Sequence, residues 1–407
     1  MALCFLACYP SKGYFLAMSS SGRGGRFVTQ LAGQASYRAF VPAALPPVPP
    51  LDWNHERQDL LEIANRGVGR LDGASLVVPN QDLFLYSHIR KEAVLSSQIE
   101  GTQSSLSDLL LFENADVPGV PVDDVREVSN YVAAMVHGLA RLRGDFPLNL
   151  RLIREIHEIL VSGSRGADKT PGEFRRSQNW VGGTSPGNAA YVPPNVPDLM
   201  PALDNFEKFL HDHESRTPLL IKAALAHAQF ETIHPFLDGN GRVGRLLITF
   251  LLCAEGALRE PLLYLSLYLK QNRTAYYESL QKVRIDGDWE QWIEFFLRGV
   301  ISVSESGVVT MRKLLALVEE DRRRIESALG TRKALTALRV HDVFKYRVAS
   351  SIPQVSNITG ISPPAVSSAI EALVKLGIVR EVTAKQRNRQ FVYEGYLRVL
   401  EGQGGGQ

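Results

Sequence analysis

The sequence is poor in cysteine, in net charge and in long apolar runs, and each shortage excludes a class of protein. Its three cysteines, Cys4, Cys8 and Cys253, are too few for a disulfide framework and lack the paired spacing of a zinc site, which indicates a reducing cytoplasm. The net charge of +2 gives no general attraction to nucleic acid or to a membrane surface. The apolar run Ala2–Ala7 is too short to span a bilayer, and it lacks the basic segment that begins a signal peptide.

What the sequence contains is typical of a globular protein with more than one domain. Hydrophobic residues make up 45% and charged residues 22% of its 407 positions, which are the proportions of ordinary soluble domains. A chain of this length holds two or three domains. We therefore expect a cytoplasmic protein without a membrane partner. Translation can begin at Met1 or at Met18, and the sequence does not decide between them.

One segment, His234–Arg245, gathers the residue types that contact the phosphates of a nucleotide. Its sequence is HPFLDGNGRVGR, and the segments on either side, Leu219–Ile233 and Leu246–Cys253, have the apolar pattern of helices. The motif is therefore predicted to be a loop that leads into the N-terminus of a buried helix. Free backbone N–H groups and the positive end of the helix dipole favour phosphate at such a place.

Each residue type in this segment suits a part of the chemistry. The glycines let the backbone curl into a nest of N–H donors, and two arginines three positions apart suit bidentate phosphate contact. Asp238 is the predicted ligand of Mg²⁺, which proteins usually hold through one or two carboxylates and the substrate's phosphates. His234 precedes the nest and is placed to act as general base. The expected ATP contacts in the loop and the helix start are Gly239, Asn240, Gly241, Arg242, Val243, Gly244 and Arg245.

The segment resembles the motif of the Fic (Fic/Doc) family, His-x-Phe-x-Asp/Glu-Gly-Asn-Gly-Arg-x-x-Arg, and every specified position is present. The resemblance implies a mostly α protein with a Fic-type helical core and a small β-hairpin, the flap. It also implies a protein adenylyltransferase, a nucleotidyltransferase that moves AMP from ATP to a Tyr, Thr or Ser hydroxyl of a target protein or of itself and releases pyrophosphate. His234 would then deprotonate the attacking hydroxyl.

A second short motif lies well before the first. The sequence from Ser96 to Gly101, SSQIEG, ends an amphipathic helical stretch, and a glutamate at a helix C-terminus opposes the dipole unless a cation meets it. It matches the inhibitory motif of Fic proteins, Ser/Thr-x-x-x-Glu-Gly/Asn. The resemblance implies that Glu100, with Ser96 in the same motif, inhibits the enzyme by pairing with Arg245 and blocking productive ATP placement. A solvated glutamate at a helix end is the alternative interpretation.

The segment Pro171–Pro194 is predicted to hold a hairpin, because Asn179–Val181 and Ala190–Val192 flank a turn rich in Gly, Ser and Pro. An exposed hairpin edge can accept an extended peptide by main-chain pairing. The segment resembles the Fic flap, which implies that it aligns the target beside the active site; an ordinary hairpin with a mobile tip is the alternative. The residues expected to dock the target are Val181, Gly182, Gly183 and Thr184.

The segment Asn272–Tyr277 resembles the part of Fic proteins that walls the adenine, which implies that Tyr276 or Tyr277 stacks on the base. Arg284 stands where some relatives have an asparagine, so the polar contact to adenine is left open. An aromatic stripe at helical spacing is otherwise typical of a core. His157, outside the motif, is expected to pack or to face solvent rather than to react.

The last section of the chain has a different character. Ile352–Thr359 and Pro363–Leu376 form a predicted helix-turn-helix. Two strands, Val379–Thr383 and Gln390–Tyr393, are predicted to follow as a hairpin around Ala384–Asn388. This order resembles a winged helix.

The basic residues of this section do not decide its role. The wing carries Lys385, Arg387 and Arg389, but the second helix carries only Lys375. DNA recognition requires basic side chains on both elements, and fold does not fix function. The sequence therefore supports DNA binding and a structural or dimerising role equally, and it does not decide whether the protein forms a homodimer.

The predicted organisation divides the chain into five parts. These are a flexible tail over 1–50, a helical region with the inhibitory motif over 51–145, a Fic core over 146–301, a linking helix over 302–334 and a winged helix over 335–400. For the tail there is an alternative, an extended strap formed by the proline-rich Val41–Pro50 over the domain surface.

Two other functions remain beside AMP transfer. One is the reverse process, hydrolytic removal of AMP, with Glu100 orienting a water molecule. The other is a DNA-binding regulator that retains a vestigial nucleotide site. Neither the target protein nor the net direction of the reaction follows from the sequence.

Overall fold

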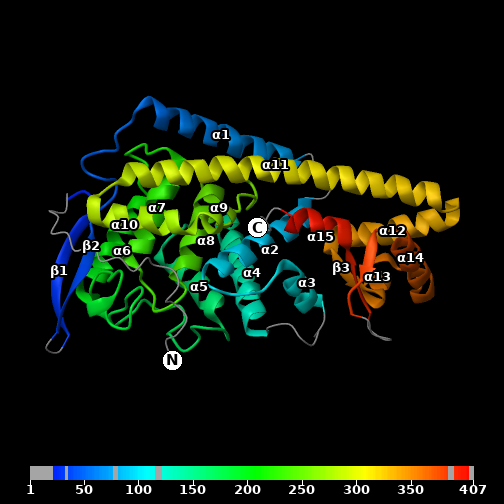
Figure 1. Ribbon diagram of the computed structural model, residues 1–407, viewed down its shortest axis with the longest axis horizontal. Coiled ribbons are helices and arrows are strands. Elements are labelled where there is room, and N and C mark those ends of the chain that lie inside the picture. Colours follow the sequence, from blue (N-terminus) through cyan, green and yellow to red (C-terminus); the bar gives the residue numbers. More distant parts are fainter. Residues whose placement is uncertain (1–21, 33–34, 77–80, 115–121, 384–388, 403–407) are drawn as a thin grey trace.

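The computed structural model describes residues 22–32, 35–76, 81–114, 122–383 and 389–402, and these form a mostly α protein, as expected (Figure 1). The first helices are α1 (His55–Leu76), α2 (Gln81–Ile99), α3 (Leu106–Asn114), α4 (Val122–Arg143), α5 (Leu150–Val161), the short 3₁₀ helix η1 (Pro186–Asn188), α6 (Val196–Leu210), α7 (Leu219–Ile233) and α8 (Asn240–Ala254). The later ones are α9 (Ser266–Gln271), α10 (Arg273–Asp286), α11 (Trp289–Ala328), α12 (Thr331–Arg347), α13 (Ile352–Thr359), α14 (Pro363–Lys375) and α15 (Glu394–Glu401). The strands are β1 (Gly25–Ala32), β2 (Ala35–Pro42), β3 (Ala349–Ser351), β4 (Val379–Glu381) and β5 (Gln390–Tyr393). No helix of the described residues is long and apolar enough to cross a membrane.

α7 and α8 pack against each other inside the larger, N-terminal part of the molecule. Every residue of α7 from Leu220 to Ile233 is buried, which is the environment that suits a helix without a polar face. α4, α5, α6, α10 and α11 surround the pair. The motif His234–Arg245 spans the loop between α7 and α8 and the start of α8, so the fold places the candidate site at the junction of two enclosed helices.

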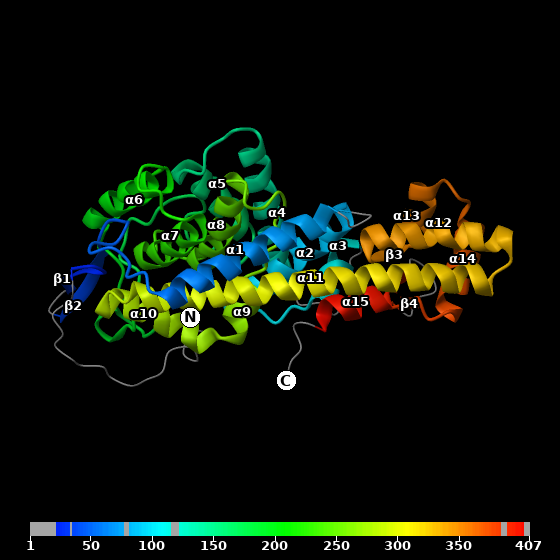
Figure 2. The same cartoon turned by 90° about the horizontal axis from the view of Figure 1, so that it is seen from above.

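α11 connects the two parts of the molecule. Its 40 residues correspond to a length of about 60 Å, and it runs beside α1 and on to the C-terminal domain (Figures 1 and 2). The sequence predicted a linking helix over 302–334, and its boundary between residues 301 and 302 falls inside this continuous helix. Gly299 and Gly307 interrupt the pattern because neighbours approach closely: a Cβ on Gly307 would lie 2.7 Å from Leu71, and one on Gly299 would lie 2.8 Å from Tyr268.

The predicted flexible tail over residues 1–50 is wrong for residues 25–42, where β1 and β2 form an antiparallel hairpin. Phe40 is fully buried, and its N–H donates to Val192 O at 2.9 Å. The sequence could not indicate this pairing because the stabilising partner is more than 150 positions away. The proline-rich segment after the hairpin is held against the surface, since Arg23 donates to Pro49 O (2.9 Å) and Pro50 O (3.0 Å). Residues 1–21 lie outside the described part of the chain.

The C-terminal domain consists of α12, β3, α13, α14, β4 and β5. Its sheet has the order β3-β5-β4 with antiparallel pairs, and a turn at Gly360 (φ 69°) separates α13 from α14. This order agrees with the winged helix expected from the sequence, an assignment that stays an interpretation. Lys385 and Arg387 of the wing lie outside the described residues.

α15 docks the C-terminal domain onto α2, the helix that leads to Glu100. The Lys91 ammonium donates to Leu400 O at 2.6 Å, and the Ser107 hydroxyl donates to Glu401 Oε1 at 2.8 Å. Burial lowers the pKa of Lys91 to about 8, although the nearby Glu401 opposes the shift. The two parts of the molecule are therefore joined by polar contacts as well as by α11.

Candidate active site

The site loop, residues 234–239, is closed by the side chain of Asn240. Its Oδ1 accepts the N–H of Phe236 at 2.8 Å and its Nδ2 donates to Phe236 O at 2.9 Å, so one amide satisfies both backbone groups of Phe236 and closes the turn. Gly239 (φ 78°) precedes the first residue of α8. His234 ends α7 in the left-handed region, with φ 49° and ψ 59°, which is uncommon for a residue with a side chain and typical of functional sites.

Two residues at the base of the flap hold the backbone of this loop, and the sequence reasoning missed both. Arg175 Nε donates to His234 O at 3.1 Å. Asn179 Nδ2 donates to His234 O at 3.1 Å and to Phe236 O at 2.8 Å. Arg175 is 2% exposed, and burial lowers its pKa to about 10. Nothing in the local pattern of the flap indicated that it supports the loop, because both contacts are made across the fold.

His234 is held as a neutral imidazole. Its Nδ1 lies 3.3 Å from Glu231 O; since a carbonyl only accepts, Nδ1 carries the hydrogen and Nε2 carries the lone pair. Burial, followed by the charge of Arg284, lowers the pKa of His234 to about 4. The imidazole is therefore uncharged at neutral pH and available to receive a proton.

Glu100 lies at the N-terminal turn of α8, on the anion-binding end of that helix. Its Oε1 accepts from Arg245 Nη2 at 2.7 Å, and a Cβ on Gly241 would come within 2.2 Å of the same oxygen. Ser96 holds Arg245 in place, since Arg245 Nε donates to Ser96 Oγ at 2.7 Å and Nη2 donates to Ser96 O at 3.0 Å. Burial works to raise the pKa of Glu100, but the charge and hydrogen bond of Arg245 outweigh it and the pKa is lowered.

Arg242 is fully buried beside this pair. Its Nη1 donates to Glu127 Oε2 at 3.1 Å, and its Nη2 is 3.6 Å from Asp238 Oδ1. Within the described residues its Nε and Nη2 have no hydrogen-bond acceptor, so a buried guanidinium keeps donors for an anion. Glu127, which burial holds at a raised pKa, was another contact that the sequence did not indicate.

Asp238 fits the role of a Mg²⁺ ligand in its chemistry. Its side chain is 27% exposed, and its Oδ1 accepts the N–H of Gly239 at 2.6 Å. Among the described residues there is no cluster of three or more His, Cys, Asp or Glu that could hold a metal. A single carboxylate at the edge of a phosphate site is nevertheless a usual donor set for Mg²⁺ when the substrate supplies further oxygens.

His157 packs, as the sequence suggested. Gly172 N–H donates to its Nδ1 at 3.0 Å, so Nε2 carries the hydrogen and donates to Asp238 O at 3.1 Å. Its ring stacks on Phe236 at 3.7 Å, and burial lowers its pKa to about 4. It is a neutral support beneath the site loop.

The flap contains one isolated bridge rather than the two-stranded hairpin predicted. Val181 and Tyr191 exchange both backbone hydrogen bonds, at 2.8 and 3.1 Å. Gly182 and Gly183 follow with φ 70° and 69°, and the N–H of Thr184 donates to Asn188 Oδ1 at 3.0 Å. The glycines and this Asx-type contact turn the chain at once, which leaves no length for a second pair.

The two tyrosines proposed for the adenine have different environments. The Tyr276 hydroxyl lies 2.8 Å from His227 Nε2, and His227 Nδ1 lies 2.9 Å from Gly244 O; the tyrosine is 1% exposed. Tyr277 is half-buried beside it. Of the pair, only Tyr277 retains surface to offer a base. Arg284 is buried and donates to Glu231 O at 3.2 Å.

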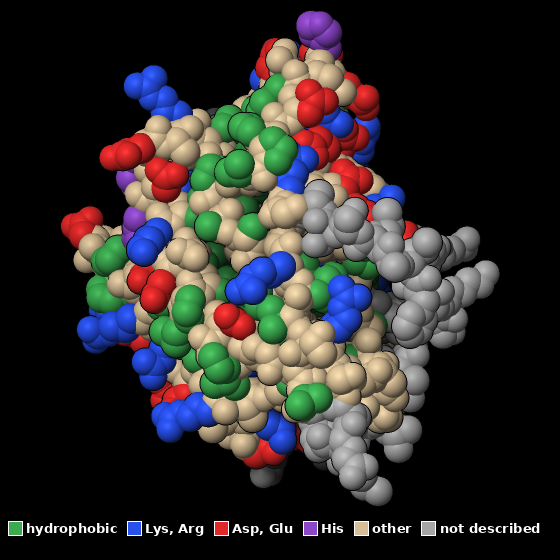
Figure 3. Space-filling model, turned by 90° about the vertical axis from the view of Figure 1, so that its left-hand side faces the viewer, with side chains coloured by type: hydrophobic (Ala, Val, Ile, Leu, Met, Phe, Trp, Pro, Cys, Tyr) green, Lys and Arg blue, Asp and Glu red, His purple; other side chains and the backbone are tan. Residues whose placement is uncertain are grey.

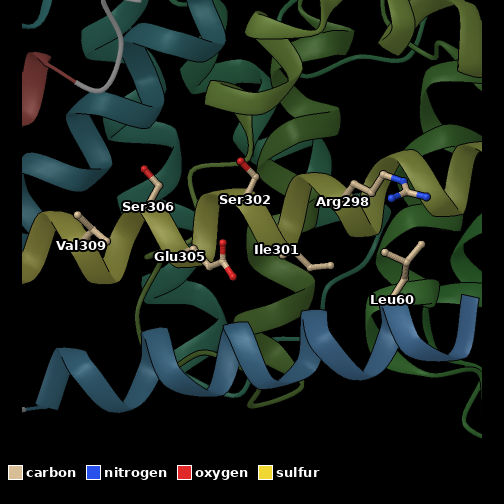
Figure 4. Close-up of a pocket in the computed structure, with 7 residues that line it drawn as sticks. All are labelled: Leu60, Arg298, Ile301, Ser302, Glu305, Ser306 and Val309. Atoms are coloured by element: carbon tan, nitrogen blue, oxygen red, sulfur yellow. The ribbon is translucent and has the colours of Figure 1, made fainter. Parts of the chain in front are cut away.

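One hollow of the described surface lies away from the site loop. A groove of about 480 Å³ between α1 and α11 is lined by Leu60, Arg298, Ile301, Ser302, Glu305, Ser306 and Val309 (Figure 4). None of these residues belongs to the two motifs. We therefore locate the candidate site by its chemistry, at the site loop and the start of α8.

Comparison with known families agrees with this location. The Fic/DOC family N-terminal model matches residues 58–140, which include Glu100, and the Fic/DOC family model matches residues 147–252, which include the site loop. Two adjacent regions of the chain are therefore similar to the two domains of the Fic/DOC family. The resemblance found in the sequence is thus confirmed.

Relatives and solved structures show how far the likeness to other Fic proteins extends. The chain is 36% identical over 202 residues to the protein adenylyltransferase Fic of Aedes aegypti and 33% identical over 200 residues to that of Drosophila ananassae. Each match covers 48% of this chain and 37% of the relative, so the chain spans little more than a third of these relatives' length. A Fic family protein from Desulfovibrio desulfuricans G20 has the same fold, with a TM-score of 0.56 at 16% identity over 84% of this chain and 97% of that one.

Proposed function

We propose that this Fic protein transfers AMP from ATP to a Tyr, Thr or Ser hydroxyl of a target protein, and that Glu100 keeps it inhibited. The observation that carries the proposal is the 2.7 Å contact between Glu100 and Arg245 above Gly241. A carboxylate lies here where a helix start and an arginine would otherwise receive a phosphate. The name of the curated relatives, protein adenylyltransferase Fic, supports the same activity.

In the proposed reaction His234 is the general base. Its Nε2 takes the proton of the target hydroxyl while the hydroxyl oxygen bonds to the α-phosphorus, and the bond from that phosphorus to pyrophosphate breaks with the electron pair leaving on pyrophosphate. Arg242, Arg245 and the N–H groups of the first turn of α8 stabilise the charge on the phosphates. Asp238 would hold Mg²⁺, which neutralises phosphate charge.

Inhibition follows from competition for one guanidinium. While Glu100 holds Arg245, that arginine cannot bind the γ-phosphate, so ATP binds with its α-phosphorus poorly aligned for attack. Truncating Glu100 frees Arg245 and opens the space above Gly241. Ser96 remains as a neutral partner, which keeps the arginine oriented for the nucleotide.

The flap is the proposed docking site of the target. Val181, Gly182, Gly183 and Thr184 lie on a segment whose base, Arg175 and Asn179, is bonded to the backbone of His234. A peptide bound there would therefore be held in fixed relation to the base. At the end of the molecule that carries β1 and β2, apolar side chains lie among charged ones of both signs (Figure 3), which suits a protein partner better than a nucleic acid.

For the C-terminal domain a structural role has more support than DNA binding. The described basic residue of the wing, Arg389, is bound to Glu381 at 2.6 and 2.9 Å. α14 contributes only Lys375 as a basic residue. The polar contacts of α15 with α2 and α3 give the domain a place in the assembly of the Fic core instead.

The test is incorporation of label from ATP that is radioactive at the α-phosphate. We expect Glu100→Gly to label itself at least tenfold more than the wild type, and Glu100→Gly/His234→Ala to remain unlabelled. Glu100→Gln, which keeps the shape and removes the charge, should give an intermediate value. Absence of label in Glu100→Gly would reject AMP transfer. Release of AMP from previously labelled protein by the wild type would favour the hydrolytic direction.

A further inference from the structure

Glu231 is a buried acid that the proposed mechanism does not use. It lies three residues before His234 near the end of α7 and is 7% exposed. Its Oε2 is 3.9 Å from His234 Nδ1. Its other oxygen, Oε1, has no hydrogen-bond partner among the described residues. A buried carboxyl oxygen without a hydrogen-bond partner is costly, so an aliphatic residue here would be more stable.

α8 is shaped to admit this carboxyl group. A Cβ on Gly244 would lie 2.4 Å from Glu231 Oε1, so only glycine leaves space for it at that position. Gly244 is one residue before Arg245. The carboxyl group of Glu231 therefore reaches from the imidazole of His234 to the backbone that carries the arginine bound by Glu100.

The charges that face Glu231 come from three other elements. Burial raises its pKa to about 7; Arg245 and Arg284 act against the rise, and Glu100 adds to it. Two carboxyl groups thus share one guanidinium while Glu100 is docked. When Glu100 leaves, the remaining neighbours favour the ionised form of Glu231. Tyr276 also faces this cluster, and it is bonded to His227.

We propose that Glu231 is a positioning residue for His234, and that it becomes effective when Glu100 leaves Arg245. The proposal rests on the proposed AMP transfer. As the proton of the target hydroxyl moves to Nε2, the imidazole becomes a cation, and the ionised Glu231 beside Nδ1 stabilises it. A carboxylate also stabilises the imidazolium of hydrolytic triads; here the charge acts across 3.9 Å, because Nδ1 is bonded to Glu231 O. Glu231 itself touches neither substrate nor nucleotide.

The kinetic test uses Glu100→Gly as the parent, so that inhibition does not mask the effect. Glu100→Gly/Glu231→Gln keeps the shape of the side chain and removes its charge. We expect a 10- to 100-fold lower kcat at pH 7 and above, and a KM for ATP within about twofold of the parent. The rise in rate that accompanies ionisation of Glu231 should also be lost; in this parent it lies below pH 7, because Glu100 no longer raises the pKa of Glu231. Glu231→Asp should retain part of the rate and the rise with pH. Glu278→Gln, on the exposed face of α10, is the matched control and should change neither quantity.

A second measurement does not depend on activity. NMR titration of His234 in Glu100→Gly should give a higher pKa than in Glu100→Gly/Glu231→Gln. With Glu100 absent, Arg245 and Arg284 keep Glu231 ionised to lower pH, and an opposite charge near the ring favours its protonated form. Equal pKa values, or equal kcat and pH profiles, would overturn the role of Glu231. If Glu100→Gly transfers no label while the two His234 pKa values differ, the proposed function fails and the coupling of Glu231 to His234 stands.

Discussion

The Fic core and the C-terminal domain differ in where their arginines lie: the core buries several of them, and the C-terminal domain keeps them at its surface. In the core Arg175, Arg242, Arg245 and Arg284 are each less than 5% exposed. In the C-terminal domain none of the described arginines is buried, and Arg380 and Arg389 form ion pairs at the surface. A buried cation is stable only where negative charge or hydrogen-bond acceptors offset the loss of its hydration. A group of buried arginines around one loop therefore indicates a site for an anion. Surface pairs indicate little beyond solubility.

The largest effect is expected when the proposed base is removed and the buried arginines of the core are left in place. His234→Ala, in the Glu100→Gly parent, should lower AMP transfer by about 10²- to 10⁴-fold, the usual contribution of a general base. ATP affinity, measured by calorimetry, should stay within a few fold because no phosphate contact is lost. A variant that still transfers AMP at the parental rate would contradict the role of His234.

Removing one member of the buried pair should cost stability in the core. Glu100→Gly removes the carboxylate that Arg245 binds directly, and breaking a buried ion pair usually costs about 3–5 kcal/mol. Saturating ATP with Mg²⁺ should restore much of this loss, because a phosphate replaces the carboxylate. Melting temperatures with and without nucleotide give the comparison. A variant as stable as the wild type without nucleotide would mean that Glu100 is an ordinary solvated helix end.

Buried histidines allow a comparison of the two regions by pH. His341 in the C-terminal domain has no hydrogen-bond partner within the described residues, whereas both ring nitrogens of His227 in the core are bonded. Burial lowers the pKa of each to about 4. The unfolded chain therefore binds the proton first as pH falls. The contribution of each neutral ring to the free energy of unfolding is complete above pH 6.5. It decreases as the pH falls towards 4, by up to about 3 kcal/mol.

His341→Leu should remove this acid sensitivity without loss at neutral pH, because no hydrogen bond is broken. His227→Leu should destabilise the protein at every pH, since Gly244 O and the Tyr276 hydroxyl lose their partner. Urea unfolding at pH 5 and pH 7.5 separates the two effects. The prediction is wrong if His341→Leu loses as much stability on acidification as the wild type.

The smallest effect is expected at the wing. Arg389→Ala removes an ion pair whose side chains are 35% and 23% exposed, and pairs of this kind contribute about 0–1 kcal/mol. Arg380→Ala, which removes the pair with Glu394, is the matched control. If Arg389→Ala alone costs several kcal/mol, the division between buried and surface charges does not hold for this domain.

The helices were largely predictable because their signals are local. α7 begins and ends at the residues predicted from its apolar pattern, as do α13 and β5, and Gly360 ends α13 in the left-handed conformation that a stop of this kind requires. The β1–β2 hairpin was not predictable, since Phe40 is stabilised by Val192 on a distant segment. The same holds for α11, whose glycines interrupt the helical pattern but are required by Leu71 and Tyr268.

The sequence by itself determined where the candidate site lies. Glycines, two arginines, an aspartate and a histidine occur within twelve positions and favour phosphate binding, because backbone curvature and side-chain charge are local properties. Only the tertiary structure decided which other side chains contact these residues. Glu100 reaches Arg245 across 145 positions, Arg175 and Asn179 hold His234 from the flap, and Glu231 has space only because Gly244 lies opposite. Such contacts arise from packing, which brings together residues that no spacing along the chain relates.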